Sequence, residues 1–183
     1  METSPKLIDL FTNRLFLRPM NSNDSQIVVR WRNSLHVSFA SDFSKGRKIS
    51  IKEHLDWFNN TRSNRIDYII NVLKTNQPIG SIGISILDTN DNKTVGELNK
   101  YIGEQDALGK GYASEALEKW IDYLFNFIKL DSIVSKTRLN NMPNIRVNEK
   151  NGFEKIENCS YFDLESKEWA YMELSKEKWQ SNI

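Results

Sequence analysis

The sequence predicts a mixed α+β fold in which a twisted, mostly antiparallel sheet carries helices on both of its faces. The length of 183 residues suits one domain, residues 1–183, and leaves little for a second. With 39% hydrophobic and 27% charged residues, the chain has the composition of a globular protein. Strand-like and helix-like patterns follow in the order strand, two helices, three strands, helix, strand, helix, two strands.

The first third of the chain predicts one strand and two helices. Residues 14–20 alternate in hydrophobicity and reach Pro19, which is typical of a strand at a sheet edge. Turn residues at 21–25 can cap a helix with the apolar positions Ile27, Val28, Trp31 and Leu35. Ser50 and Glu53 have the spacing of a capping box, and the helix that they begin has the apolar positions Ile51, Leu55 and Phe58.

The remaining elements follow from apolar patterns and turn residues. We expect an antiparallel meander of three strands, separated by turns, at 67–73, 79–86 and 94–102. Apolar residues at the i, i+3, i+4 and i+7 spacing predict a long helix over 113–128. After it we expect a strand, a helix that Asn151–Gly152 ends, and two last strands, at 132–139, 143–150, 153–159 and 169–174.

Composition excludes several classes of function. Lys and Arg number 25 and Asp and Glu 24, so the net charge of +1 gives no electrostatic argument for a nucleic-acid partner. Cys159 is the only cysteine, which excludes an internal disulfide and a multi-cysteine zinc site, and we expect no metal. The sequence has no signal-peptide pattern and no run of about 20 apolar residues, so we expect a soluble cytoplasmic protein with no membrane partner.

A glycine-bearing turn between the meander and the long helix predicts an anion site. Residues 105–113 read Q-D-A-L-G-K-G-Y-A, so a strand leads through Gly109 and Gly111 into a helix N-terminus. Backbone N–H groups at such a terminus lack partners, and glycines let a phosphate approach them without a Cβ in the way. The turn is neither a P-loop nor a G-x-G-x-x-G motif, because Ser114 stands where the latter needs glycine.

This loop and the order of the elements resemble the GNAT superfamily of acyl-CoA-dependent N-acetyltransferases. The pyrophosphate loop of that family reads Q/R-x-x-G-x-G/A, and residues 106–111 read D-A-L-G-K-G. The second family signature, N-x-x-S-I-R-x-x-E-K-x-G-F, is similar to N-M-P-N-I-R-V-N-E-K-N-G-F at 141–153. The resemblance extends from Arg14 to Leu174 and implies direct transfer of an acetyl group from acetyl-CoA to an amine, without a metal.

The resemblance implies where acetyl-CoA binds. Its diphosphate would lie on the backbone N–H groups from Gly109 to Ala113, and its pantetheine arm along the strand that ends at Tyr101 and Ile102. The implied cofactor-binding residues are Tyr101, Ile102, Leu108, Gly109, Lys110, Gly111, Tyr112, Ala113, Asn141 and Asn144. Three positions depart from the family pattern: Asp106 replaces Gln or Arg, Asn144 replaces Ser or Ala, and Asn148 stands where many members carry the tyrosine that protonates the leaving thiolate.

The resemblance also implies catalytic roles. Glu97 is the expected general base for the amine, because many relatives keep a glutamate on the strand before the pyrophosphate loop. The candidate general acid, which protonates the leaving thiolate, is Tyr171 on the last strand, with Tyr161, Tyr112 or water as alternatives. A backbone N–H near residues 98–100 would polarise the thioester carbonyl.

The first two helices bear on the choice of acceptor. W-R-N at 31–33 and E-H-L-x-W-F at 53–58 are similar to acetyltransferases that modify 4-amino sugars on nucleotide carriers for surface polysaccharides. A sugar nucleotide needs cations for its diphosphate and aromatic faces for its base or sugar. The candidate substrate-binding residues are Arg30, Trp31, Arg32, Asn33, His54 and Trp57.

Other functions stay open at this point. Ribosomal-protein-type N-terminal acetyltransferases share the second signature and often lack its tyrosine, and an aminoglycoside is a further acceptor to consider. In a different class, the chain is a non-catalytic acyl-CoA-binding module in which Asp106 and Asn148 record lost chemistry. We expect a monomer or a homodimer.

Overall fold

One sheet of eight strands organises the computed structural model, which describes residues 7–40, 47–89, 93–157 and 168–181. The strand order is β1-β2-β3-β4-β5-β6-β8-β7, and every neighbouring pair is antiparallel except β5 with β6. The fold class is therefore the predicted one. The strands are β1 (Leu10–Phe11), β2 (Leu15–Pro19), β3 (Arg65–Val72), β4 (Pro78–Leu87), β5 (Val95–Ile102), β6 (Ser132–Arg138), β7 (Glu154–Lys155) and β8 (Trp169–Ser175).

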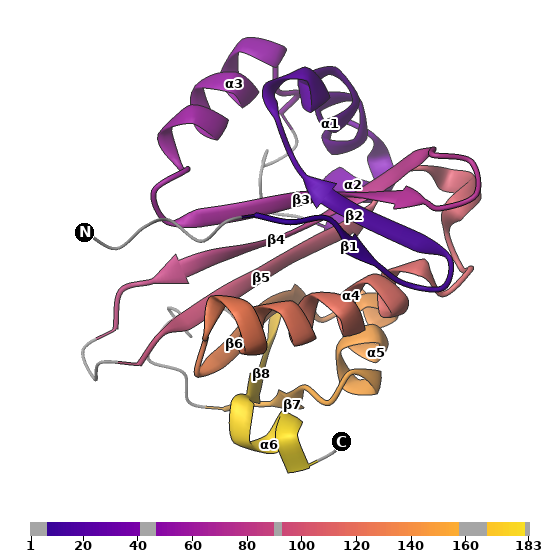
Figure 1. Ribbon diagram of the computed structural model, residues 1–183. Coiled ribbons are helices and arrows are strands. Elements are labelled where there is room, and N and C mark those ends of the chain that lie inside the picture. Colours follow the sequence, from indigo (N-terminus) through magenta and orange to yellow (C-terminus); the bar gives the residue numbers. More distant parts are fainter. Residues whose placement is uncertain (1–6, 41–46, 90–92, 158–167, 182–183) are drawn as a thin grey trace.

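Helices cover both faces of this sheet, as predicted, with α1 and α3 on one face and α4 and α5 on the other (Figure 1). The first group is η1 (Ser22–Asp24), α1 (Ser25–Arg32), α2 (Leu35–Ala40) and α3 (Ile51–Asn60). The second group is η2 (Gln105–Ala107), α4 (Tyr112–Tyr123), its π-helical continuation η3 (Leu124–Ile128), α5 (Met142–Lys150) and α6 (Lys176–Ser181). Among the described helices, none is long and apolar enough to cross a membrane.

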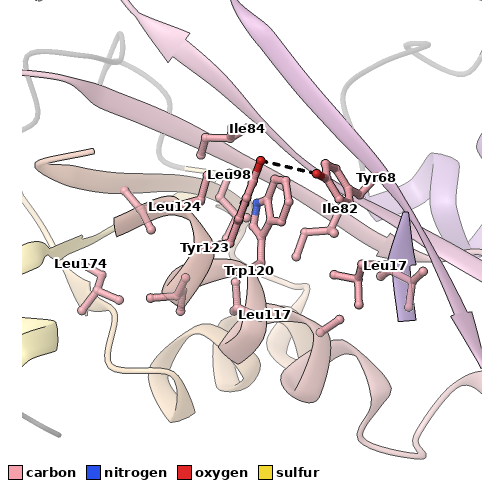
Figure 2. Close-up of a cluster of buried hydrophobic side chains, with 14 of the residues drawn as sticks. Leu17, Tyr68, Ile82, Ile84, Leu98, Leu117, Trp120, Tyr123, Leu124 and Leu174 are labelled. Carbon is pink, nitrogen blue, oxygen red and sulfur yellow. Dashed lines mark hydrogen bonds between the residues drawn. The ribbon is translucent and has the colours of Figure 1, made fainter. Parts of the chain in front are cut away.

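The larger of two apolar clusters lies between α4 and the sheet. Figure 2 shows Trp120 and Tyr123 of α4 beside Tyr68 of β3, and the Tyr68 and Tyr123 hydroxyls are 3.5 Å apart. The Trp120 side chain is fully buried, with its ring centroid 4.8 Å from that of Tyr68. The smaller cluster lies on the opposite face, where α1 and α3 pack on Ile69. The two clusters fix the helices on both sides of β5.

Two predictions in the N-terminal region are wrong. The 14–20 strand does not lie at the edge, because β1 pairs with its residues Phe16 and Leu17. The first predicted helix is divided into α1, which ends at Arg32, and α2, and between them the Ser34 hydroxyl donates to the carbonyl oxygen of Trp31 at 2.5 Å. Leu35 consequently lies outside the apolar face of α1 and is 88% exposed.

The C-terminal region adds one helix and shortens one strand. Helix α6 was not predicted, although Ser175 accepts a hydrogen bond from the Lys178 N–H at 3.2 Å as a capping residue does. Trp179 of this helix packs on Phe125, with ring centroids 5.2 Å apart. Within the described part of the predicted 153–159 strand, only Glu154–Lys155 forms a strand.

Candidate functional site

A cavity of about 390 Å³ lies where β5 and β6 separate. The two strands pair in parallel only from Val95 to Glu97 on β5, and each then continues without the other. Six of the residues predicted to form the site line this cavity: Arg32, Trp57, Glu97, Tyr101, Asn141 and Asn144. Five lining residues that sequence reasoning missed carry charge or a large ring: Arg65, Asp67, Lys100, Lys136 and Trp169.

The separated part of β5 presents backbone donors to the cavity side. In an antiparallel pair, N–H groups alternate between the partner strand and the opposite side. The Gly103 N–H donates to the Ile79 carbonyl oxygen at 2.8 Å and therefore faces β4. By this alternation the N–H groups of Leu98, Lys100 and Ile102 face away from β4, toward the side that β6 has left.

Glu97 stands at the last paired position before the separation. Burial raises the pKa of its carboxyl group, and the charges of Arg65 and Lys136 act in the opposite direction. A raised pKa makes a carboxylate a better proton acceptor near neutral pH. The position thus combines access to the cavity with the chemistry of a base.

Lys100 lines the cavity from the opposite face of β5 to Glu97. Side chains alternate between the two faces of a strand, and Lys100 is three residues after Glu97. Its ammonium nitrogen donates to Oδ1 of Asn144 at 2.6 Å and to Oδ1 of Asn148 at 2.5 Å. Burial lowers the pKa of Lys100 to about 7. The only signal in the sequence was the unusual Asn148, whose partner lies 48 residues away.

A cationic and aromatic group forms another part of the wall. The guanidinium of Arg65 donates to both carboxylate oxygens of Asp67 at 2.9 to 3.0 Å, and Arg62 lies 3.4 Å from the same carboxylate. The guanidinium carbons of Arg32 and Arg65 lie 5.2 and 5.0 Å from the Trp57 ring centroid. Burial lowers the pKa of Arg32 from its usual value. The stack therefore concentrates positive charge beside a large ring.

The predicted phosphate loop is an open cradle at the start of α4. Gly109 and Gly111 have φ of +72° and +78°, the left-handed region that favours glycine, and nothing lies within 4 Å of a Cβ built on Gly109. Arg14 fixes the loop: its Nη1 donates to the Lys110 carbonyl oxygen at 3.0 Å, and its Nε donates to Glu115 at 2.6 Å. The Arg14 guanidinium also lies 4.7 Å from the Tyr112 ring centroid. The open cradle fits an anionic group, and the Arg14–Glu115 ion pair holds its shape.

Three residues predicted to bind substrate lie outside the lining of the cavity. Trp31 is 1% exposed and packs in the smaller cluster, where its indole N–H donates to Glu104 at 2.8 Å, which argues against its predicted substrate contact. The exposed Arg30 pairs with the same glutamate. The side chain of Asn33 bonds the backbone N–H and carbonyl of Ile49 at 2.9 and 2.8 Å, so it fixes the chain before α3.

Two further candidates are buried elsewhere. His54 is 2% exposed, stacks on Trp57 with ring centroids 5.3 Å apart, and is not among the described lining residues, which argues against its predicted substrate contact. Burial, and then the charge of Arg32, lowers its pKa to about 4. Tyr171 is buried on β8 opposite Lys136 and outside the lining, which argues against its role as the acid. Cys159 and Tyr161 lie outside the described residues.

The fold and the predicted site agree with the comparison with known families. The model of the GNAT acetyltransferase domain matches residues 14–154, so the chain belongs to this family. It is an N-acetyltransferase whose acyl donor is acetyl-CoA, as the two sequence signatures predict. Among the described residues, no group of three or more His, Cys, Asp or Glu side chains is placed to hold a metal ion.

Individual relatives extend the comparison. An uncharacterized N-acetyltransferase, p20 of Bacillus licheniformis, is 28% identical over 152 residues, which cover 80% of this chain and 82% of that protein. The apo structure of FdhC, a nucleotide-linked sugar GNAT, has a TM-score of 0.76 at 20% identity and covers 97% of this chain and 95% of its own. An aminoglycoside acetyltransferase, AAC(6')-Ib, in complex with coenzyme A has a TM-score of 0.74 at 19% identity, covering 91% and 98%. Both structures show the shared fold.

The buried His54 makes stability depend on pH. Because its pKa falls from about 6.5 in the unfolded chain to about 4 in the fold, the unfolded chain binds the proton more readily. Its contribution is complete above about pH 6.5 and is lost as pH falls toward 4. We expect wild type to lose about 2 kcal/mol more unfolding free energy than His54→Phe between about pH 7 and pH 4.5, measured by urea denaturation. Equal losses in both proteins would contradict this.

Proposed function

We propose that this acetyltransferase acts on the primary amine of a nucleotide-linked amino sugar. The charge of the cavity carries the proposal. On the face of the sheet that holds Glu97, three cations among the described lining residues, Arg32, Arg65 and Lys136, stand against the two carboxylates of Asp67 and Glu97. A diphosphate is stabilised in such surroundings, whereas a polycationic aminoglycoside needs an excess of carboxylates.

The aromatic residues of the cavity support the same acceptor. Trp57 lies beside two arginines at one side, and the Trp169 ring has the Lys136 ammonium 4.4 Å from its centroid. Planar rings stack with a nucleobase or with the apolar face of a sugar, and adjacent cations pair with phosphate. The cationic and aromatic side chains thus occur together, as a sugar nucleotide requires. Acetyl-CoA and nucleotide sugars are cytoplasmic metabolites, so the proposal includes action in the cytoplasm.

The open loop at Gly109 supports the predicted site of the donor diphosphate. Its two glycines keep Cβ atoms out of the cradle, and the N-terminus of α4 adds its dipole. Outward N–H groups of β5 then lead from this loop to the cavity. Acetyl-CoA supplies an acetyl group activated as a thioester. The chain binds its anionic end at the loop and aligns the rest along β5.

Glu97 acts as the base in this proposal. The acceptor amine must lose a proton to attack the acetyl carbon, and the Glu97 carboxylate at the edge of the cavity accepts it directly or through water. A backbone N–H from Leu98 or Lys100 stabilises negative charge on the acetyl oxygen. These roles need no covalent link to the protein.

Two substitutions test the phosphate cradle: one adds a negative charge to it, and the other removes a negative charge near it. We expect Gly109→Glu to abolish acetyl-CoA binding in calorimetry, because a carboxylate then occupies the cradle and a side chain must adopt φ of +72°. Asp106→Asn removes a negative charge three residues before Gly109 and should tighten acetyl-CoA binding a few-fold. Unchanged affinity in Gly109→Glu would contradict the assignment of the donor site.

The base is tested by Glu97→Gln, which keeps the shape of the side chain. We expect kcat to fall by about 10²-fold or more, with the acetyl-CoA affinity and thermal unfolding unchanged. Wild-type kcat should also fall as pH drops through the raised pKa of Glu97, since only the carboxylate accepts a proton. A variant rate within twofold of wild type would assign the proton transfer to another group.

The acceptor class is tested by a thiol-release screen. We expect wild type to turn over nucleotide-linked 4-amino sugars and to leave aminoglycosides and N-terminal peptides unacetylated. Arg32→Met should raise KM for the sugar nucleotide about tenfold, the scale of a lost charge-assisted hydrogen bond, and leave KM for acetyl-CoA unchanged. Arg30→Met is the control, because it removes the same charge outside the cavity lining. Turnover confined to aminoglycosides or peptides would refute the proposed acceptor.

A further inference from the structure

The Lys100 ammonium is held by two side-chain amides, those of Asn144 and Asn148. Both amides that accept from it are oriented by hydroxyls of β6: Asn144 Nδ2 donates to Thr137 Oγ1 at 2.9 Å, and Asn148 Nδ2 donates to Ser135 Oγ at 3.1 Å. Because each NH₂ group is engaged by a hydroxyl, each amide oxygen is directed to Lys100. Asn148 is fully buried, so its amide depends on these protein partners rather than on water.

The surroundings of this ammonium are polar but uncharged. Of the described side chains facing it, α5 offers the two amides, β6 offers Ser135 and β4 offers the apolar Ile82 at the paired position. The carboxylates of the cavity, Asp67 and Glu97, project from the other face of the sheet. The two amide oxygens favour the charged ammonium, but with no carboxylate beside it they do not offset the loss of water around it. Burial accordingly lowers the pKa of Lys100 to about 7.

We propose that Lys100 is the general acid of the transfer and gives its ammonium proton to the departing thiolate sulfur. This role rests on the proposed function. It gives a source for the proton that the leaving thiolate needs and that Asn148 cannot supply, because a side-chain amide does not titrate. Asn148 instead touches the acid and positions it. Lys100 and Glu97 approach the reacting atoms from opposite faces of β5, so the acid and the base are kept apart.

The proton balance closes with these two groups. The bond between the acceptor nitrogen and the acetyl carbon forms as the carbon–sulfur bond breaks. Glu97 or water takes the proton that the nitrogen loses, and Lys100 gives one to sulfur, so that free thiol leaves. The neutral Lys100 amine then regains a proton from solvent, and the Glu97 proton returns there. The transfer has no net change of charge on the protein.

The kinetic test compares Lys100→Met with Lys150→Met, which removes an exposed lysine of α5. We expect Lys100→Met to lower kcat by about 10²-fold, with the acetyl-CoA affinity changed less than threefold. Wild-type kcat should fall as pH rises through about 7, since only the protonated lysine donates, and this limb should vanish in Lys100→Met. Adding Asn148→Tyr to Lys100→Met should restore part of kcat and move the limb toward pH 10, where a phenol titrates.

A second measurement needs no turnover. Lysines of the free protein labelled by reductive ¹³C-methylation should include one amine that titrates near pH 7 by NMR and that is missing from Lys100→Met. If wild type binds acetyl-CoA and releases thiol while Lys100→Met stays within twofold of its kcat, the role of Lys100 is refuted and the proposed function stands. If wild type neither binds acetyl-CoA nor releases thiol, the proposed function is refuted and the role falls with it.

Discussion

The separation of β5 from β6 after Glu97 is the constraint on which the rest of the site depends. Unpaired strand edges inside a sheet are costly, because their N–H and carbonyl groups lose partners. Here each strand is held by its outer neighbour: β4 pairs along all of β5, and β8 along all of β6. The two strands therefore stay apart without distorting the sheet. The cavity, the outward N–H groups of β5, and the access of Glu97 and Lys100 from its two faces all follow from this one feature.

A nearly neutral chain can serve two anionic substrates because the charges are distributed locally. The net charge of +1 argued against nucleic acid, yet both proposed substrates carry a diphosphate. At the predicted phosphate loop the favourable charge would come from backbone dipoles, which add nothing to the formal total. In the cavity it comes from a few cations, and Asp67 is already paired with Arg65 and Arg62. The net charge therefore does not report this local arrangement, which depends on the fold.

The sequence predicted what local patterns encode. Apolar periodicity placed α4, the capping box of Ser50 and Glu53 placed α3, and two motifs predicted the family. What it could not predict depends on contacts between distant residues: the Lys100–Asn148 pair and the tie between Arg14 and Glu115 are 48 and 101 residues apart. Trp31 and His54 were predicted at the substrate but are buried outside the cavity lining, because an aromatic side chain on a helix has the same pattern whether it faces a cavity or a core. By contrast, Ser175 is a residue type that caps helix N-termini, so the sequence does contain a signal for α6.

The distance along β5 adds an argument about the donor. The strand connects the separation point at Glu97 with the turn that leads to the phosphate loop after Ile102. Five residues of strand span roughly 17 Å at about 3.3 Å per residue. A donor that binds its phosphates at Gly109 and reacts beside Glu97 must therefore carry its acyl group at the end of a long arm. A compact acyl phosphate cannot span this distance, whereas acetyl-CoA can if its arm lies along the outward N–H groups of β5, as proposed. The geometry that opens the cavity thus also selects the kind of donor that reaches it.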